Sequence, residues 1–173
     1  MDKCNIVLCG FMASGKTTVG RLLSETTGLP LADTDAIVEQ EAGMPVSEIF
    51  ASGGEKRFRE LERKVVAAVS ARAGVVIAAG GGAVLDRRNV TELKKLGVVY
   101  FLDVTPTEVV RRVGTDASRP ILPGDVSDIE SLMGERATAY DEAVDVFVST
   151  TGRDPREVAL QIASDFECRR QGV

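Results

Sequence analysis

Histidine is absent from the 173-residue chain. Its absence excludes the Ser-His-Asp and Cys-His groups of nucleophilic enzymes and every metal site with histidine ligands. Acid–base chemistry must therefore come from aspartate, glutamate, lysine, tyrosine, cysteine or water. Only three cysteines occur, Cys4, Cys9 and Cys168, and their spacing fits neither a zinc site nor a disulfide framework. We expect them to be buried, reduced thiols in a cytoplasmic protein.

Basic residues are fewer than acidic ones: the chain has 21 lysines and arginines and 26 aspartates and glutamates, which gives a formal net charge of −5. This balance argues against nucleic acid as a partner, since phosphate backbones select basic surfaces. A few arginines in one cleft can still attract a small anionic substrate. The most apolar stretch, GVVIAAGGGAVL, is short and broken by glycines, and no signal peptide is visible. We therefore expect neither a nucleic-acid nor a membrane partner.

Five short apolar runs predict strands. They lie near residues 5–9, 29–33, 75–79, 98–104 and 145–150. Most of them lack polar alternation, which is typical of parallel strands covered on both faces. Because helical patterns separate the runs, the sequence predicts an α/β fold with a parallel sheet, in a single domain that spans residues 1–173.

Helical patterns fill the intervals between these runs. One follows the first glycine-rich loop and should end at Gly28 and Pro30. A second carries an apolar stripe that includes Phe58 and Val65. Further helices are expected at residues 86–96 and 107–113, from about 129, and from 155. Two segments resemble loops, ASGGE at 51–55 and GTDASRPILPGD at 114–125, and the second is a candidate lid of about residues 113–125.

The segment GFMASGKTTVG contains the pattern G-x-x-x-x-G-K-T, formed by Gly10, Gly15, Lys16 and Thr17. Backbone N–H groups of such a loop, with the N-terminus of the next helix, bind phosphate oxygens. Lys16 can neutralise the β- and γ-phosphates, and the Thr17 hydroxyl can bind Mg²⁺. The motif follows a predicted strand and opens a predicted helix, as it requires, so the sequence predicts a nucleotide site.

Several classes of nucleotide-binding protein share this loop. A switch GTPase would usually carry an N-K-x-D motif, but neither Asn5 nor Asn89 begins one. A mechanical ATPase would normally be larger. A small chain with a lid-like loop favours a small-molecule kinase.

Two aspartates follow the second predicted strand, in LADTDA. In open α/β sheets, ligands bind at the edge where the strands end. Asp33 and Asp35 are two residues apart in what we expect to be extended chain, so both can point into the cleft. One can hold Mg²⁺ through water, and the other can take a proton from a substrate hydroxyl. Asp33 or Thr34 could instead cap the next helix, and Asp103 competes with Asp33 for the metal.

Arginines and glycines add further candidates. Arg59 has a carboxylate one helical turn away on each side, so it forms either a surface ion pair or an anion clamp. Gly80–Gly82 follow the third strand and let the backbone approach a ligand. In the lid, Arg119 could reach a transferring phosphoryl group. Arg136 could be another anion clamp or a surface residue.

Taken in order, the motifs are GFMASGKTTVGRLL, DTD, GEKRFRELE, GGGAV, SRPIL, RATAY and GRDP. From about residue 4 to 166 the chain resembles the shikimate kinase family, of the nucleoside-monophosphate-kinase-like P-loop class. The resemblance implies a three-layer fold in which helices cover both faces of a five-stranded parallel sheet of order 2-3-1-4-5. It also implies an enzyme that phosphorylates the 3-hydroxyl of shikimate with ATP, in aromatic amino-acid biosynthesis. Independently of the resemblance, we expect a monomer, because no long exposed apolar helix or heptad seam is apparent in the sequence.

The resemblance further implies a set of site residues. The ATP site would comprise Ala13, Ser14, Gly15, Lys16, Thr17, Thr18, Arg112, Arg119, Arg153 and Pro155. The shikimate site, in a region of about residues 34–62 and beyond it, would comprise Asp35, Arg59, Gly80, Gly81, Gly82 and Arg136. Mg²⁺ would be held by Thr17 and, through water, by Asp33, which favours Asp33 over Asp103. The catalytic residues would be Lys16, Asp35 as general base, and Arg119.

The chain departs from the family pattern at Ile121, where leucine is usual, and at Thr138, where proline is common. Neither change removes a charged contact. Two alternatives stay open at this point. One is another small-molecule kinase, for gluconate or a nucleotide, although residues 36–62 look too small to bind a base. The other is a nucleotide-binding regulator without catalysis.

Overall fold

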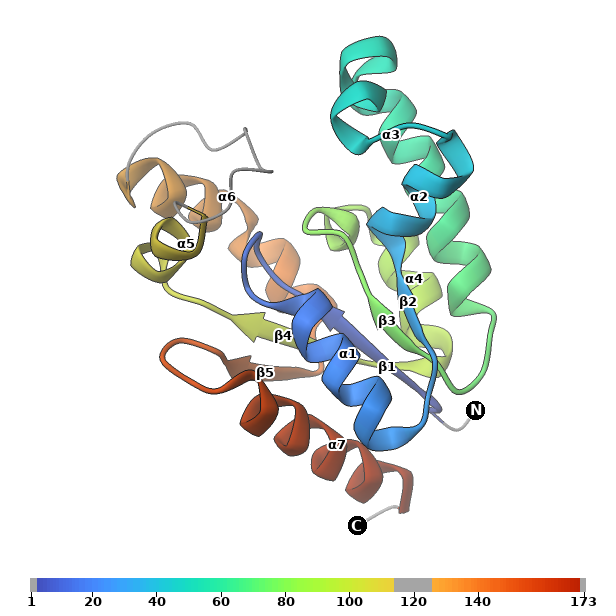
Figure 1. Ribbon diagram of the computed structural model, residues 1–173, viewed down its shortest axis with the longest axis vertical. Coiled ribbons are helices and arrows are strands. Elements are labelled where there is room, and N and C mark those ends of the chain that lie inside the picture. The colour runs from blue at the N-terminus through green and yellow to red at the C-terminus, as the bar shows by residue number, and fades with distance from the viewer. Residues whose placement is uncertain (1–2, 114–125, 172–173) are drawn as a thin grey trace.

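The computed structural model describes residues 3–113 and 126–171, and most of the predicted lid, with Arg119, lies outside these ranges. The strands are β1 (Asn5–Cys9), β2 (Leu31–Asp33), β3 (Val76–Ala78), β4 (Gly97–Asp103) and β5 (Val146–Ser149). They form one sheet of order β2-β3-β1-β4-β5, in which every neighbouring pair is parallel (Figure 1). The predicted strand order and direction are confirmed.

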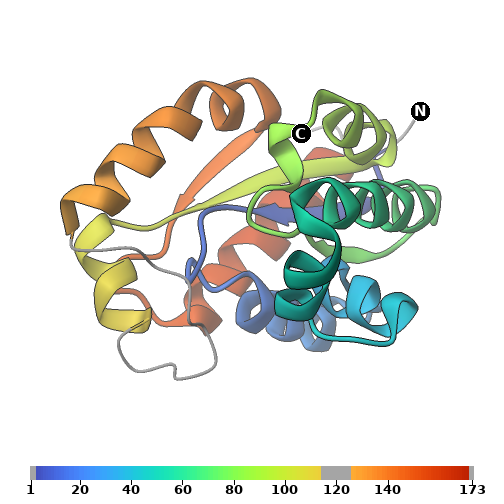
Figure 2. The ribbon, with the colours of Figure 1, turned by 90° about the horizontal axis from the view of Figure 1, so that it is seen from above.

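Seven α-helices and one short 3₁₀ helix are present in the described residues. They are α1 (Lys16–Thr27), α2 (Thr34–Ala42), α3 (Val46–Ser70), η1 (Ala83–Leu85), α4 (Arg87–Leu96), α5 (Pro106–Val113), α6 (Val126–Ala143) and α7 (Pro155–Gln171). Figure 2 shows α4 and α6 on one side of the sheet and α1 on the other. Among the described helices, none is both long enough and apolar enough to cross a bilayer.

Strands β1 and β3, and β4 up to Leu102, are buried on both faces, as their apolar runs predict, whereas the edge strand β5 is partly exposed. Ile6 and Leu8 of β1 pack with α1 and α7, whereas Val7 and Cys9 pack with α3 and α4 on the opposite face. Successive side chains of a strand point to opposite faces, so one five-residue strand contributes to both apolar layers. These two buried layers fix the positions of the strand ends, after which the candidate site residues follow.

The segment ASGGE was expected to be a loop, and this expectation is wrong. Helix α3 runs through it, and only Gly54 leaves the helical conformation, with φ of 66° and ψ of −178°. Glycine adopts such a positive φ without steric cost, so one residue can break the helix while helical residues continue on both sides. The segment is a kink within α3.

The cysteines are also less uniform than expected. Cys9 is buried in β1, but Cys4 is partly exposed and Cys168 is exposed. Burial raises the pKa of the Cys9 thiol to about 12, so it stays protonated at neutral pH. All three are free thiols, as predicted.

Candidate active site

A cleft of about 1490 Å³ opens where the parallel strands end. Its lining contains almost every site residue expected from the sequence: Ala13, Ser14, Gly15, Lys16, Thr17, Thr18, Asp33, Asp35, Arg59, Gly81, Gly82, Arg112, Arg136, Arg153 and Pro155. Gly80 lies behind this surface, and Arg119 is outside the described residues. The fold therefore gathers residues from seven segments of the chain into one continuous cavity.

The phosphate-binding loop curls tightly between β1 and α1. A side chain at Gly10 would come within 2.7 Å of the Leu102 carbonyl oxygen, and Gly10 has φ of 145°, so only glycine fits there. Ala13 adopts φ of 58°, which is uncommon for a residue with a side chain. The Lys16 ammonium donates to the carbonyl oxygens of Gly10 (3.0 Å) and Phe11 (2.9 Å). The lysine is thus held inside the loop, where a phosphate group would bind.

Asp33 lies beside the phosphate-binding loop and also caps α2. The Thr17 hydroxyl donates to Oδ2 of Asp33 at 2.8 Å, while Oδ1 accepts from the backbone N–H of Asp35 at 3.1 Å. Because α2 begins at Thr34, the expectation that the two aspartates lie on extended chain is wrong, although both line the cleft. Asp103 at the end of β4 is exposed and does not line the cleft. The structure thus places Asp33, and not Asp103, next to Thr17.

Two of the three consecutive glycines leave room for the acidic and basic side chains of the site. At Gly80, an added Cβ would lie 3.0 Å from Oε1 of Glu62 and closer still to Oδ1 of Asp35. At Gly82, it would lie 2.6 Å from Nη2 of Arg59. These glycines therefore permit close packing of Asp35 and Arg59 against the loop after β3, a role more specific than backbone freedom.

Arg59 is held in place by two carboxylates of α3. Nη1 of Arg59 bonds to Oε2 of Glu62 at 2.9 Å, and Nη2 bonds to Oε1 of Glu55 at 3.2 Å. The Glu62 side chain is only 1% exposed. Burial raises the pKa of Glu62, the Arg59 hydrogen bond opposes that rise, and the nearby Asp35 charge adds to it. The sequence placed a carboxylate at this spacing but did not show that it is buried.

Arg136 reaches the cleft from α6. Its guanidinium lies 5.7 Å from the centre of the Phe11 ring, in the geometry of a cation–π contact. Phe11 is fully buried next to the phosphate-binding loop. This contact directs Arg136 into the cavity instead of into solvent, so the two arginines enter the cleft from different helices, α3 and α6.

The opposite end of the cleft joins α5 to the loop after β5. Arg112 donates to the carbonyl oxygens of Ala13 and Thr150, both at 3.0 Å, and so connects the phosphate-binding loop with that segment. Arg153 donates to the Ser149 carbonyl oxygen at 3.2 Å. These contacts bring together the residues expected at the adenine.

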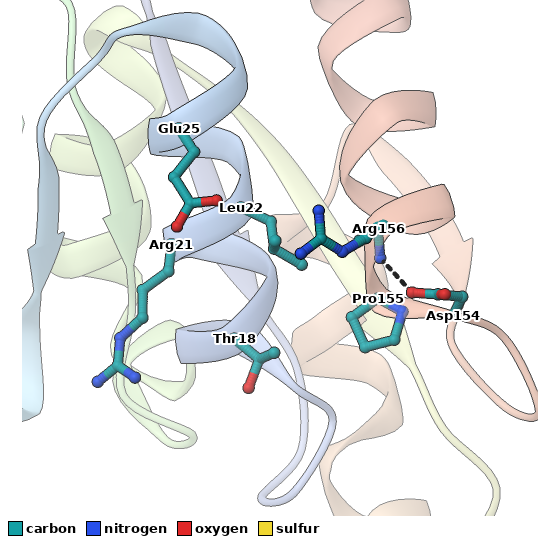
Figure 3. Close-up of a pocket in the computed structure, with 7 residues that line it drawn as sticks. All are labelled: Thr18, Arg21, Leu22, Glu25, Asp154, Pro155 and Arg156. Atoms are coloured by element: carbon teal, nitrogen blue, oxygen red, sulfur yellow. Dashed lines mark hydrogen bonds between the residues drawn. The ribbon is translucent and has the colours of Figure 1, made fainter.

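A smaller hollow of about 360 Å³ lies between α1 and the start of α7 (Figure 3). Thr18 and Pro155 line both this hollow and the main cleft. Asp154 accepts from the backbone N–H of Arg156 at 2.8 Å, which satisfies a donor at the start of α7. The hollow therefore adjoins the main cleft beside the phosphate-binding loop.

A phosphate-binding loop on a parallel sheet of order 2-3-1-4-5 defines a P-loop kinase of the nucleoside-monophosphate-kinase-like class. A family model described as shikimate kinase matches residues 12–167. A shikimate kinase of Moorella thermoacetica is 47% identical over 159 residues, which cover 91% of each chain. The chain belongs to the shikimate kinase family, and its activity is the ATP-dependent phosphorylation of shikimate, in the shikimate pathway.

Solved structures agree with this assignment. The shikimate kinase of Acinetobacter baumannii, solved in complex with shikimate, superposes with a TM-score of 0.89 and 32% identity, covering 95% of this chain and 93% of that one. A gluconokinase of Sinorhizobium meliloti superposes with a TM-score of 0.64 but only 15% identity, covering 98% and 94%. The second likeness shows the shared fold alone. Family membership therefore decides against the gluconate kinase, the nucleotide kinase and the regulator.

Proposed function

We propose that the cleft binds ATP at its phosphate-loop end and shikimate at the end formed by α2, α3 and α6. This assignment of the two substrates to two ends of the cleft is supported by one observation: a single continuous cavity extends from Lys16 to Arg59 and Arg136. Phosphoryl transfer depends mainly on positioning and charge stabilisation, so two adjacent subsites in one cavity are what the reaction needs.

At the shikimate end, the substrate carboxylate pairs with Arg59 and Arg136. Planar guanidinium groups bind carboxylates through two parallel hydrogen bonds, and Arg59 is already oriented by its own carboxylate partners. The backbone N–H groups of Gly81 and Gly82 contribute main-chain contacts. Asp35 accepts hydrogen bonds from the substrate hydroxyls and takes the proton of the 3-hydroxyl as it attacks the γ-phosphorus.

At the ATP end, Ala13–Thr18 surround the phosphates, and Lys16 stabilises the charge that develops on them. The side chain of Lys16 must then exchange its carbonyl partners for phosphate oxygens. Arg112, Arg153 and Pro155 frame the adenine. The role of Arg119 at the transferring phosphoryl group, and of residues 113–125 as a lid, rests on the sequence resemblance.

The residues beside the phosphates fit Mg²⁺. A hydroxyl and a carboxylate oxygen, from Thr17 and Asp33, lie 2.8 Å apart at the start of α1. Mg²⁺ prefers oxygen ligands and commonly uses one or two protein oxygens together with phosphates and water. When bound, the ion would neutralise phosphate charge. Asp33→Asn should weaken the response of the rate to Mg²⁺, whereas Asp103→Asn, outside the cleft, should leave it unchanged.

We also propose that residues 1–173 act as one kinase domain, with the substrate region near residues 34–62, and that the protein is a cytoplasmic monomer. The net charge of −5 supports the absence of a nucleic-acid partner. A membrane partner is likewise not expected. Sedimentation of the purified chain at several concentrations tests the monomer.

The deciding experiment measures ADP release with Mg·ATP and shikimate, gluconate or AMP. Shikimate alone should stimulate release. Asp35→Asn should lower kcat by about 10²–10⁴, and Arg136→Ala should raise KM for shikimate far more than KM for ATP. A near-normal kcat in the first variant, or equal effects on both substrates in the second, would remove that residue's proposed role.

A further inference from the structure

Tyr140 lies on α6 one helical turn after Arg136, so the two side chains share a face of the helix. The residue is 4% exposed, and its ring packs against Phe101 of β4, with ring centres 4.7 Å apart. The aromatic ring is thus fixed in the core beneath the cleft. What remains to be explained is the hydroxyl at its tip.

That hydroxyl donates to the carbonyl oxygen of Gly81 at 2.9 Å. Burial raises the pKa of Tyr140, while the charge of Arg136 and a hydrogen bond from its side chain oppose that rise. The hydroxyl therefore contacts the glycine loop after β3 directly, and it lies near enough to Arg136, one turn earlier on α6, for the arginine's charge to lower its pKa.

The contact with Gly81 also constrains its neighbour. The peptide bond that joins Gly81 to Gly82 is planar and trans, so its C=O and N–H point in opposite directions. A hydroxyl that fixes the Gly81 carbonyl therefore fixes the direction of the Gly82 N–H. Glycine pairs otherwise rotate more freely than any other residues, so an external restraint matters most there.

We infer that the Tyr140 hydroxyl is a positioning group for substrate binding, which holds Arg136 and the Gly82 N–H in the arrangement that receives the shikimate carboxylate. This inference rests on the proposed function, in which Arg136 and Gly82 bind that carboxylate. Tyr140 acts through its two neighbours and not on the substrate itself.

The test uses the full chain with Tyr140→Phe, which removes one oxygen and keeps the ring. Tyr100→Phe is the matched control, because Tyr100 is also buried and its hydroxyl donates to Asp165 of α7 at 2.7 Å, on the face of the sheet away from Arg136. Tyr140→Phe should raise KM for shikimate on the order of tenfold, the loss expected for a hydrogen bond next to a charged group. KM for ATP and kcat should stay within about twofold of the parent values.

Tyr100→Phe should leave both KM values unchanged. Tyr100→Phe also loses a hydrogen bond and should lower the melting temperature. If Tyr140→Phe likewise lowers only the melting temperature, the positioning role is refuted. Equal increases in KM for shikimate and for ATP would refute it as well.

Arg136→Ala distinguishes a failure of the Tyr140 positioning role from a failure of the proposed carboxylate site. If Arg136→Ala raises KM for shikimate and Tyr140→Phe does not, only the inference fails. If Arg136→Ala leaves that KM unchanged, the carboxylate site itself is wrong. In the double variant, the effect of Tyr140→Phe should be smaller than in the parent, because part of it acts through Arg136, and a fully multiplicative effect would contradict the coupling.

Fluorescence offers a second readout. The chain has no tryptophan and two tyrosines, so Tyr140 is the sole source of tyrosine emission in the Tyr100→Phe variant. Shikimate added to that variant should change the emission in a saturable manner. If the emission is unchanged at shikimate concentrations that saturate the rate, the environment of the Tyr140 side chain does not change when shikimate binds, and the positioning role is contradicted.

Discussion

Gly80→Ala tests whether the exact place of Asp35 governs catalysis. Gly80 is not among the residues with positive φ, so alanine can adopt its backbone conformation. The new methyl group would lie 3.0 Å from Oε1 of Glu62 and 3.3 Å from Cγ of Asp35, and would overlap Oδ1 of Asp35. Because Cβ atoms essentially never approach other heavy atoms more closely than 3.0 Å, the Asp35 carboxylate must move.

The magnitude follows from this overlap. A displacement of a reacting group by about 1 Å costs on the order of 10²-fold in rate, which corresponds to about 2.7 kcal/mol of activation free energy. Inserting a methyl group into a packed site costs about 1–3 kcal/mol of folding stability. We therefore expect a folded protein with a kcat about 10²-fold below that of the parent.

The assay is steady-state ADP release with saturating shikimate and Mg·ATP, together with thermal unfolding. Gly134→Ala is the control, because that glycine lies on α6 and an added Cβ would meet nothing within 4 Å. The control should keep the parent kcat. A Gly80→Ala protein that is folded and turns over within about twofold of the parent would refute the argument that the position of Asp35 limits the reaction.

Three further predictions concern other parts of the molecule. Gly82→Ala should displace the Arg59 guanidinium, since Nη2 would lie 2.6 Å from the new methyl group, and should raise KM for shikimate while KM for ATP stays constant in the same kinetic assay. Lys16→Ala should abolish most turnover with an unchanged circular dichroism spectrum, and near-normal turnover would contradict its role at the phosphates. Hydrogen bonding from Arg88 lowers the pKa of Asp86, at the start of α4, from 3.8 to about 2. The ionised Asp86 carboxylate therefore adds to the free energy of unfolding above pH 4, and this stabilisation is lost as the pH falls toward 2. In urea unfolding, Asp86→Ala should therefore lower the free energy of unfolding by about 1–2 kcal/mol at pH 7 and by much less near pH 2, and a pH-independent difference would be inconsistent with that linkage.

Much of the fold could be predicted because its signals are local. After Asn5, strand β1 is an unbroken apolar run because it is covered on both faces, and this pattern is visible without knowing which helices cover it. The phosphate-binding loop is formed by eight consecutive residues, Gly10 to Thr17, so its chemistry could also be predicted. The strand order and the family's residue roles came instead from the resemblance of the ordered motifs.

Two sequence-based expectations were wrong, the loop at ASGGE and the extended chain at Asp33 and Asp35. In both segments the local sequence is compatible with a helix as well as with the expected conformation. ASGGE contains two glycines, which are typical of loops, yet the chain is helical on both sides of Gly54, in a stretch where residues 51–57 are all exposed. A glycine inside a helix costs only about 1 kcal/mol, which is too little to end the helix. Asp33 and Asp35 follow a strand, but the chain turned into α2 immediately after Asp33. At Asp33 the deciding interaction is local, because the Asp33 carboxylate accepts from the N–H groups of Asp35 and Ala36 and so starts α2.

The sequence by itself determined the five strands, the phosphate loop and the identities of the charged residues that line the cleft. Only the tertiary structure decided the contacts that hold those residues in place: Asp35 against Gly80, Arg59 against Gly82, and the Tyr140 hydroxyl on Gly81. These pairs are separated by 45, 23 and 59 positions along the chain. Such contacts depend on how the sheet and helices pack, and packing is a property of the whole folded chain that no short segment of sequence encodes.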